Sequence, residues 1–380
     1  MKNICAMLLL ALVSEVCYAQ NALDREKLLD FYQTQRYADA ASYLSSIYPA
    51  ETTDMKALSQ IAYCSMMAGN LVEAEKAYQK MNALQPQQIS VLFSLANINS
   101  RRGNKKNANN YLLQVVTIDS SNFNAYKRLA DYTDSTALKM QYLQKANKLN
   151  ATEADVAFDL ARIYRNSKEY EPAYNVLKVA IAADTSNMIL QQALLPVANQ
   201  LKKYNEVIAT GEKLLKNGAD GSVVIDVGKA YFFLKNYKKA LSLFLMLEKM
   251  SMQNESIFYY MSLCYREMKS YEMAAKYAKL TIDESISPNI TAYYNLLGGI
   301  YEEKQQLNLA ANAFKKGLSY SPNKNSYYRL GLLYDLKLKQ PKSARTYYSL
   351  FLKSKDLEKD DQPQVDYVKV RMEEFAKAKR

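Results

Sequence analysis

The chain has 380 residues, 49% of them hydrophobic and 23% charged, a composition typical of a folded protein rather than of a disordered chain or a fibre. It has no His and no Trp, which excludes imidazole-dependent catalysis and His-ligated metal sites, and its 10 Gly and 8 Pro leave little room for turn-rich β structure. The net charge is +12, and from Lys304 to Arg380 there are 17 Lys and Arg against 8 Asp and Glu, a local difference of +9.

Residues 1–19 have the pattern of a secretory signal peptide. Lys2 supplies the positive start, residues 4–13 form the apolar run, and Ala19 closes a small-x-small cleavage site. The run is shorter than the ~20 apolar residues that a membrane-spanning helix needs. We therefore expect an exported protein of the periplasm or cell surface. A lipoprotein anchored through Cys17 is an alternative, although Val16 stands where a small residue normally precedes the lipidated cysteine.

After the signal, alanines recur with a period close to 34 residues, which indicates a repeat architecture. The spacing is 34 from Ala40 to Ala74 and again to Ala108. After one gap the series continues at Ala173, Val207, Ala240, Ala274, Ala310 and Ala344, with spacings of 34, 33, 34, 36 and 34. Within each period apolar residues recur every three or four positions, with one break in the middle and one at the end. This pattern predicts two short antiparallel α-helices in each repeat.

Several repeats share a set of small and large residues. The clearest copies are Tyr294, Leu297, Gly298, Tyr301, Leu307, Ala310, Phe314, Gly317 and Pro322; then Val224, Val227, Gly228, Tyr231, Tyr237, Ala240, Phe244 and Leu247; then Leu160, Ala161, Tyr164, Tyr170, Ala173, Leu177 and Ala180. From Leu23 to Leu352 the chain resembles the tetratricopeptide repeat (TPR) family. The resemblance implies an all-α fold, a right-handed α-α superhelix of about nine to ten helical hairpins whose core is supplied by stacking.

In chain order, the chain is predicted to divide into five segments. These are the signal peptide at 1–19, TPR units 1–3 at 20–122, a truncated TPR unit at 123–153, TPR units 5–10 at 154–358, and a C-terminal capping helix and tail at 359–380. Pro196 lies inside a predicted first helix and is expected to kink it, because proline lacks a backbone donor. The segment 216–221 contains two glycines and is predicted to end a helix and to act as a hinge.

Two expectations concern packing between helices. A small residue in the first helix, such as Gly228, Gly298 or Gly331, is expected to face the alanine of the second helix and let the two backbones approach. Cys64 and Cys264, the cysteines left after the signal, are expected to be buried and unpaired, because each repeat of a solenoid touches only its neighbours.

The first helix of each unit lines the inner face of such a superhelix, where the family usually binds peptides. Projection of this register gives a candidate partner-binding groove made of Tyr63, Phe93, Asn97, Arg101, Phe158, Arg162, Arg165, Lys229, Phe232, Tyr259, Arg266, Asn295 and Tyr328. Aromatic and Arg side chains are the types that anchor interfaces, since each buries a large area at modest entropic cost. The alternative is that these aromatics only fill gaps between units.

The sequence carries no motif for catalysis or cofactor binding. Neighbouring carboxylates such as Glu302 and Glu303 diverge by about 100° on a helix, and there is no phosphate-binding Gly-rich loop and no Cys-x-x-Cys. We expect no enzyme activity, no cofactor and no metal, but a bacterial scaffold that binds a protein or peptide partner, in an envelope assembly by analogy with the family.

Two alternatives for the exposed surface stay open. A carbohydrate- or envelope-polymer-binding module would use exposed tyrosines and the basic C-terminal end, which could also support peripheral association with the envelope. The other interpretation of the basic C-terminal end is a solvated, lysine-rich surface with no binding role. Nucleic acid is not expected as a partner, because no known base-reading module is present. The sequence does not indicate an oligomeric state.

Overall fold

The computed structural model describes residues 23–218, 220–285 and 288–377, so the expected signal peptide lies outside the described residues. Within these ranges the chain forms helices and turns and no strand. It divides into two compact units, Met1–Thr185 (unit 1) and Ser186–Arg380 (unit 2). The repeat boundaries in the sequence did not predict this division, because the alanine spacing of 34 continues from Ala173 to Val207 across it.

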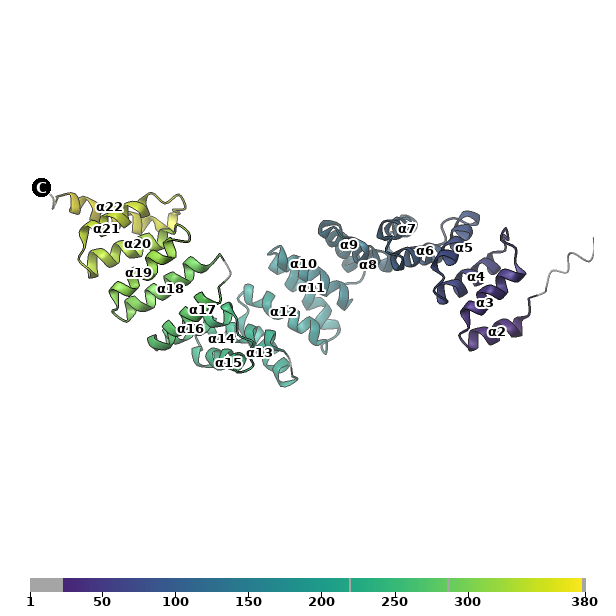
Figure 1. Cartoon of the computed structure of the whole chain (residues 1–380), viewed down its shortest axis with the longest axis horizontal. Coiled ribbons are helices and arrows are strands. Elements are labelled where there is room, and N and C mark those ends of the chain that lie inside the picture. The colour runs from purple at the N-terminus through teal and green to yellow at the C-terminus, as the bar shows by residue number, and fades with distance from the viewer. Residues whose placement is uncertain (1–22, 219, 286–287, 378–380) are drawn as a thin grey trace, which may run out of the picture. The chain divides into compact units, whose positions relative to one another are not determined.

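Unit 1 consists of five helical hairpins among its described residues (Figure 1). Each hairpin joins two consecutive helices, and its second helix also contacts the first helix of the next hairpin. The helices are α2 (Arg25–Gln33), α3 (Tyr37–Ile47), α4 (Met55–Met67), α5 (Leu71–Leu84), α6 (Ile89–Arg101), α7 (Lys105–Ile118), α8 (Phe123–Tyr132), α9 (Thr136–Leu149), α10 (Ala154–Asn166) and α11 (Tyr170–Ala183).

Unit 2 repeats this arrangement with five more hairpins and one additional C-terminal helix in its described part (Figure 1). Its helices are α12 (Met188–Gln200), α13 (Tyr204–Lys216), α14 (Gly221–Phe233), α15 (Tyr237–Lys249), α16 (Glu255–Glu267), α17 (Tyr271–Asp283), α18 (Ile290–Glu303), α19 (Leu307–Leu318), α20 (Lys324–Leu332), η2 (Leu333–Lys337), α21 (Pro341–Leu352), η3 (Lys359–Asp361) and α22 (Gln362–Lys377). The predicted all-α solenoid of helical hairpins with a C-terminal helix is confirmed.

Most of the first helices begin at a short polar residue that caps them. The Asp54 carboxylate accepts backbone N–H bonds from Lys56 (2.8 Å) and Ala57 (3.2 Å) at the start of α4, and Asp24 does the same for α2. Asn122, Asn187, Asn254 and Asn323 each accept one backbone N–H three residues on. These side chains satisfy backbone donors that the first turn of a helix leaves without an intrahelical partner.

The turn inside nine of the hairpins contains one residue in the left-handed region, always five positions before the repeating small residue. Their φ values lie between 51° and 83°. Glycine takes this conformation without steric cost, but a residue with a Cβ does not. The residues are Gln35, Gly69, Gly103, Lys168, Lys202, Lys235, Lys269, Gln305 and Lys339. The hairpin α8–α9 has no such residue, and its first helix has 10 residues where α4, α6 and α10 have 13.

Three glycines of the first helices lie against aromatic rings of the second helices. A Cβ built on Gly228 would lie 2.7 Å from the ring of Phe244, and one built on Gly298 would lie 2.8 Å from the ring of Phe314. Gly331 is covered in the same way by Tyr348. These glycines therefore make room for an aromatic ring one turn beyond the alanine of the second helix, a contact that the prediction did not include.

The last hairpin contains an extra residue, which a π-helical turn accommodates. The small residue of the first helix and the alanine of the second are 12 apart from Gly298 to Ala310, but 13 apart from Gly331 to Ala344. The π-helix η2 lies between Gly331 and Ala344 and takes up the additional residue. The π-helix η2 places Asp335 in the core, where the helix α22 covers the Asp335 side chain.

Two further local predictions are confirmed, and the kink expected at Pro196 stays a prediction. Pro196 lies inside α12, and α13 ends at Lys216 with Gly218 in the left-handed region (φ 82°), which confirms the predicted helix end. Cys64 and Cys264 are both buried and unpaired, as expected. None of the described helices is long and apolar enough to cross a membrane.

Candidate functional site

All thirteen residues of the predicted groove lie on first helices, namely α4, α6, α10, α14, α16, α18 and α20. None of them is fully buried: Tyr63, Arg101, Arg162 and Arg165 are exposed, and the other nine are half-buried. Seven lie in unit 1 and six in unit 2, so each unit presents its own set. The structure brings some of these side chains into contact and leaves others apart.

In unit 1, Tyr63 belongs to a small aromatic group at the first two hairpins. It is 42% exposed and makes edge contacts with Tyr32 and Tyr37, at ring-centroid distances of 6.4 and 6.0 Å. The Cys64 thiol donates to the Tyr32 hydroxyl at 3.5 Å. Burial raises the pKa of Tyr32, and the hydrogen bond with Cys64 raises it further, so the Tyr32 hydroxyl stays protonated at physiological pH.

The remaining candidates of unit 1 are spread over α6 and α10. Phe93 packs against the core, and the Arg128 guanidinium lies over its ring at 5.2 Å. Arg162 pairs with Asp159 at 3.0 Å on its own helix. Both Phe93 and Phe158 are half-buried, so each presents only part of a ring to a partner.

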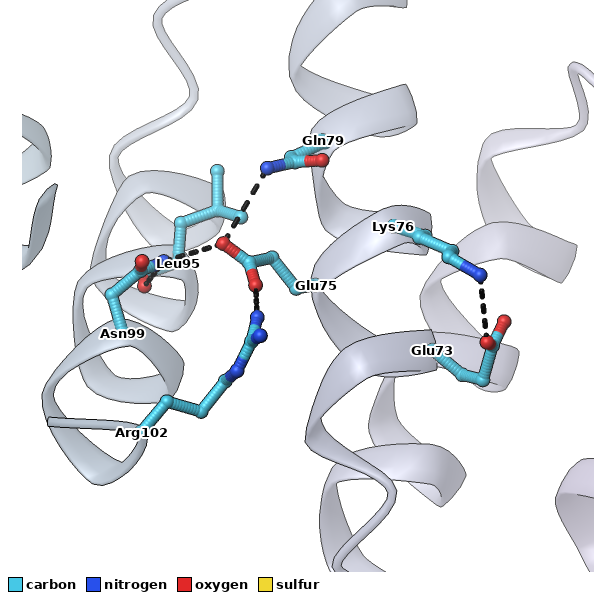
Figure 2. Close-up of polar contacts among 7 residues, drawn as sticks. All are labelled: Glu73, Glu75, Lys76, Gln79, Leu95, Asn99 and Arg102. Atoms are coloured by element: carbon cyan, nitrogen blue, oxygen red, sulfur yellow. Dashed lines mark hydrogen bonds and ion pairs between the residues drawn. The ribbon is translucent and has the colours of Figure 1, made fainter. Parts of the chain in front are cut away.

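A buried polar network joins two consecutive hairpins of unit 1. Figure 2 shows Glu75 of α5 between Gln79 of its own helix and Asn99 and Arg102 at the end of α6. Glu75 is 8% exposed; the Asn99 amide donates to it at 2.8 Å, and Arg102 forms an ion pair with its second oxygen. Because every member has a partner inside the network, we assign it to holding the hairpins together, as polar groups in a core require.

In unit 2, the predicted residues on α14 and α16 form a continuous aromatic cluster. Phe232 contacts Tyr260 at 5.3 Å, Tyr260 contacts Tyr259 at 5.7 Å, and the Lys229 ammonium lies 5.4 Å over the Tyr260 ring. Tyr259 continues to Tyr293 of α18 at 5.4 Å. Burial raises the pKa of both Tyr259 and Tyr260, so neither phenol ionises at neutral pH.

Sequence reasoning missed four members of this cluster, namely Tyr204, Phe233, Tyr260 and Tyr293. Tyr204 stacks on Phe233 with centroids 5.1 Å apart and planes 11° apart, and Phe233 reaches Tyr260 at 6.3 Å. Phe233 is 47% exposed and is the most open ring of the cluster. The prediction of groove residues considered only the inner-face positions of first helices. Phe233 is the last residue of the first helix α14, and Tyr204 is the first residue of the second helix α13. The adjacent pair Phe232-Phe233 next to a turn was the signal available in the sequence.

The remaining candidates of unit 2 serve the structure within and between hairpins. Arg266 pairs with Glu303 at 3.0 Å, and Asn295 accepts from the Ser326 hydroxyl at 2.6 Å. Tyr328 lies against the buried Phe351 at 5.2 Å. Arg266 and Asn295 link neighbouring hairpins and Tyr328 packs within its own hairpin, so these side chains contribute less to an open surface than the aromatic cluster does.

No group typical of catalysis stands out in the described part of the chain. Burial raises the pKa of Cys264 to about 12, which keeps its thiol protonated and unreactive. The described residues hold no group of three or more His, Cys, Asp or Glu placed to hold a metal ion.

A surface cavity of ≈ 380 Å³ in unit 2 is lined by α13, α14 and α15. The Tyr231 hydroxyl at its wall donates to Glu212 and accepts from Lys239 at 3.2 Å, so its polar groups pair with one another. Burial and the bond to Glu212 raise the pKa of Tyr231. The cavity offers apolar walls to a side chain and no activated group.

Comparison with known families identifies the last two hairpins. The tetratricopeptide repeat model matches residues 291–324 and 325–356, which take in α18–α19 and α20–α21. The chain contains tetratricopeptide repeats. Seven of the other eight described hairpins share the left-handed turn residue of α18–α19 and α20–α21, and α8–α9 lacks it. Repeats of this family generally act as protein-interaction scaffolds, because stacked hairpins expose long surfaces. A comparison with curated protein sequences gives no match.

Several solved structures resemble this TPR chain at low identity. A tetratricopeptide repeat protein from Parabacteroides merdae shares 17% identity, covering 63% of this chain and 96% of its own, with a TM-score of 0.39. A human IFIT1 dimer with PPP-AAAA shares 15%, covering 94% and 88%, with a TM-score of 0.48. The MamA protein shares 20%, covering 44% and 96%, with a TM-score of 0.37.

Proposed function

We propose that this TPR chain is a non-catalytic scaffold that holds a protein or peptide partner on the first-helix surfaces of its repeats. The observation that carries the proposal is the aromatic cluster of α14 and α16, in which Phe232, Tyr259 and Tyr260 touch one another and Lys229 lies over one ring. The rings are half-buried, so their positions are set before a partner arrives. Binding then costs little side-chain entropy, which favours aromatic anchors at interfaces.

We further propose that the chain works outside the cytoplasm, in an assembly of a bacterial envelope. Support for this part comes from the sequence of residues 1–19 alone, with its positive start, short apolar run and small-x-small site. Sequencing the N-terminus of the mature protein by mass spectrometry tests it. A chain that begins at Gln20 supports export by cleavage, and a lipid on Cys17 supports the lipoprotein alternative.

Recovery of partners from an envelope extract tests the scaffold proposal. The bait is the protein from Gln20 to Arg380, compared with a variant in which Phe93, Phe158 and Tyr259 are changed to Ala. The matched control changes Tyr320 and Tyr367, which are 51% and 38% exposed and lie outside the first helices. We expect the first variant to lose partners that the wild type and the control both retain.

Equal recovery by all three proteins would argue against the first-helix surfaces. Sedimentation with purified cell-wall polymer separates the carbohydrate alternative. Polymer binding that survives the triple substitution and disappears at high salt would assign function to the basic C-terminal end instead, because salt screens exposed charges.

A further inference from the structure

The turns inside three consecutive hairpins of unit 2 carry the same pair, an apolar residue followed by lysine. The pairs are Leu201-Lys202, Leu234-Lys235 and Met268-Lys269, and the lysines have φ values of 59°, 61° and 60°. All three lysines are exposed, and Leu234 and Met268 are 43% and 38% exposed. One edge of these hairpins therefore presents a repeated combination of an open apolar side chain and a positive charge.

Aromatic contacts join the first two of these turns. Tyr204 follows the first turn and stacks on Phe233, which precedes the second, at 5.1 Å. On the other side of the second turn, Tyr237 lies 5.6 Å from Phe232. Phe233 also reaches Tyr260 of α16, the helix that leads into the third turn, at 6.3 Å. With 47% of its surface open, Phe233 offers a ring face between the turn lysines.

The charge of this edge is positive. The segments 201–206, 234–239 and 267–272 contain six lysines against three glutamates, a difference of +3. Glu272, one of the three, forms an ion pair with Lys304, and Glu206 and Glu267 are the others. Most of the charge excess of unit 2 lies elsewhere, because residues 304–380 carry +9 of its +10 and residues 186–303 have 13 Lys and Arg against 12 Asp and Glu. The six lysines of the three segments therefore make this edge locally positive, and they favour an acidic partner for it.

The backbone gives a reason to regard the turn lysines as more than a solvated surface. In unit 1 the same position holds Gln35, Gly69, Gly103 and Lys168, and glycine is the residue that the left-handed conformation favours. Three successive turns of unit 2 all hold a lysine there, a run that the four left-handed turns at this position in unit 1 do not have. A strained residue that recurs at exposed turns points to a use for its side chain, because nothing in the packing requires it.

We infer that the turn edge of unit 2, defined by Lys202, Phe233, Lys235 and Lys269, docks an acidic polypeptide segment that carries an aromatic or apolar anchor. Carboxylates of the segment pair with the lysines, and the anchor packs on Phe233 and Leu234. Glu206 and Glu267 lie among these lysines and repel a uniformly anionic surface, which favours a peptide over a lipid bilayer or a sulfated glycan. The three lysines lie outside the first helices, but Phe233 ends α14 and contacts Phe232 and Tyr260 of the surface proposed above, so the triple-glycine variant is the one that separates the two proposals.

Fluorescence anisotropy with defined probes tests the inference on the protein from Gln20 to Arg380. The probe is a labelled random copolymer of Glu and Tyr, compared with polyglutamate, phosphatidylglycerol vesicles and heparin. The informative variant is K202G/K235G/K269G, because glycine suits the left-handed turn and the fold is kept while three charges are removed. The matched control is K353Q/K355Q/K359Q, which removes three exposed or partly exposed lysines elsewhere in unit 2.

We expect the copolymer to bind more tightly than polyglutamate, vesicles or heparin. The triple-glycine variant should weaken its binding about tenfold, the sum of three exposed ion pairs, and the control should change it less than about twofold. The variant Phe233→Ala should remove most of the preference for the copolymer over polyglutamate.

Four results would overturn the inference. They are absence of copolymer binding by the wild type, unchanged binding by the triple-glycine variant, an equal loss in the control, and tighter binding of vesicles or heparin through the same lysines. The last result would assign the edge to an anionic lipid or glycan and remove the polypeptide segment as its partner.

Discussion

The size of two side chains sets how a hairpin closes. Where the first helix has glycine, as at Gly228 and Gly298, the residue 16 positions later is phenylalanine; where it has alanine, as at Ala96 and Ala161, that residue is leucine. The glycine leaves space for a ring that a Cβ would meet at less than 3 Å. Ala62, which is followed by the buried Tyr78, departs from this pairing. The pairing conserves the volume between the helices, as close packing requires.

The variant Gly298→Ala should lower the free energy of unfolding by about 1–2 kcal/mol, because overpacking against Phe314 outweighs the better helix propensity of alanine. Changing Phe314 to Leu in the same chain should recover most of the loss, since Ala with Leu is the pair used elsewhere. Urea denaturation of the two single variants and the double variant measures the coupling. Additive losses would show that the two side chains do not share this space.

Backbone conformation at the turns provides a second residue-scale test. Lys235 has a φ of 61°, so Lys235→Gly should raise the free energy of unfolding by about 1 kcal/mol through relief of steric strain. In Lys279→Gly, in the middle of the helix α17, glycine should instead cost about 0.5–1 kcal/mol. The two urea midpoints should therefore move in opposite directions. A shift of both in the same direction would contradict the left-handed turn.

At the scale of elements, the C-terminal helix is held by one ion pair to the π-helical turn. Arg371 of α22 donates to both oxygens of Asp335, at 2.7 and 2.8 Å, and the Tyr348 hydroxyl donates to the same carboxylate at 3.3 Å. The Asp335 side chain is only 3% exposed, so it depends on this guanidinium for its charge. The helix α22 thus closes the last hairpin with a charged contact in addition to the buried Val368.

Removal of this contact should release the cap. We expect Arg371→Ala to lower the stability of the last hairpin by about 3 kcal/mol, because Asp335 stays buried without a cation. Lys369→Ala on the same helix should change stability by less than about 0.5 kcal/mol, since Lys369 is exposed. Limited proteolysis measures release of α22. Equal cleavage of the two variants would show that the pair does not hold the helix.

The ion-paired carboxylate of Glu302, which joins neighbouring elements, predicts that stability depends on pH. Burial alone would raise the pKa of Glu302, but hydrogen bonds from Arg329 (2.7 Å) and Lys337 (3.1 Å) outweigh it and lower the pKa below 4.5. A lowered carboxyl pKa adds stability that is present above the unfolded value and is lost as the pH falls through the folded value. Glu302→Gln should thus be about 1 kcal/mol less stable than wild type at pH 7. Urea midpoints of the two proteins should converge below pH 4, and a constant difference down to pH 3 would contradict the assignment.

The sequence predicted the elements well where a repeat carried the information. The alanine period predicted the hairpins, and segment 216–221 marked a real helix end. The π-helical turn was missed, although the spacing of 13 from Gly331 to Ala344 was its trace in the sequence. The contact of Phe233 with Tyr204 could not be predicted from one helix register, because it joins the end of one hairpin's first helix to the previous hairpin's second helix. Whether the thirteen groove residues bind a partner stays a prediction.

At the scale of the molecule, the stacking of hairpins implies that stability is local. Within each unit every hairpin contacts its neighbours along the chain, so the free energy of the unit is a sum of hairpin terms and interface terms. The division between Thr185 and Ser186 has no counterpart in the repeat spacing, because the spacing reports the internal geometry of a hairpin and not the contact between two of them. A perturbation in one hairpin should therefore fade over a few hairpins.

Hydrogen exchange with mass spectrometry on wild type and Gly298→Ala tests this claim most directly. Stacked hairpins predict faster exchange in α18 and α19 and in the adjoining helices α16, α17, α20 and α21, while exchange in α2–α7 stays at the wild-type rate. An equal loss of protection in all helices would show a single cooperative core and contradict the account.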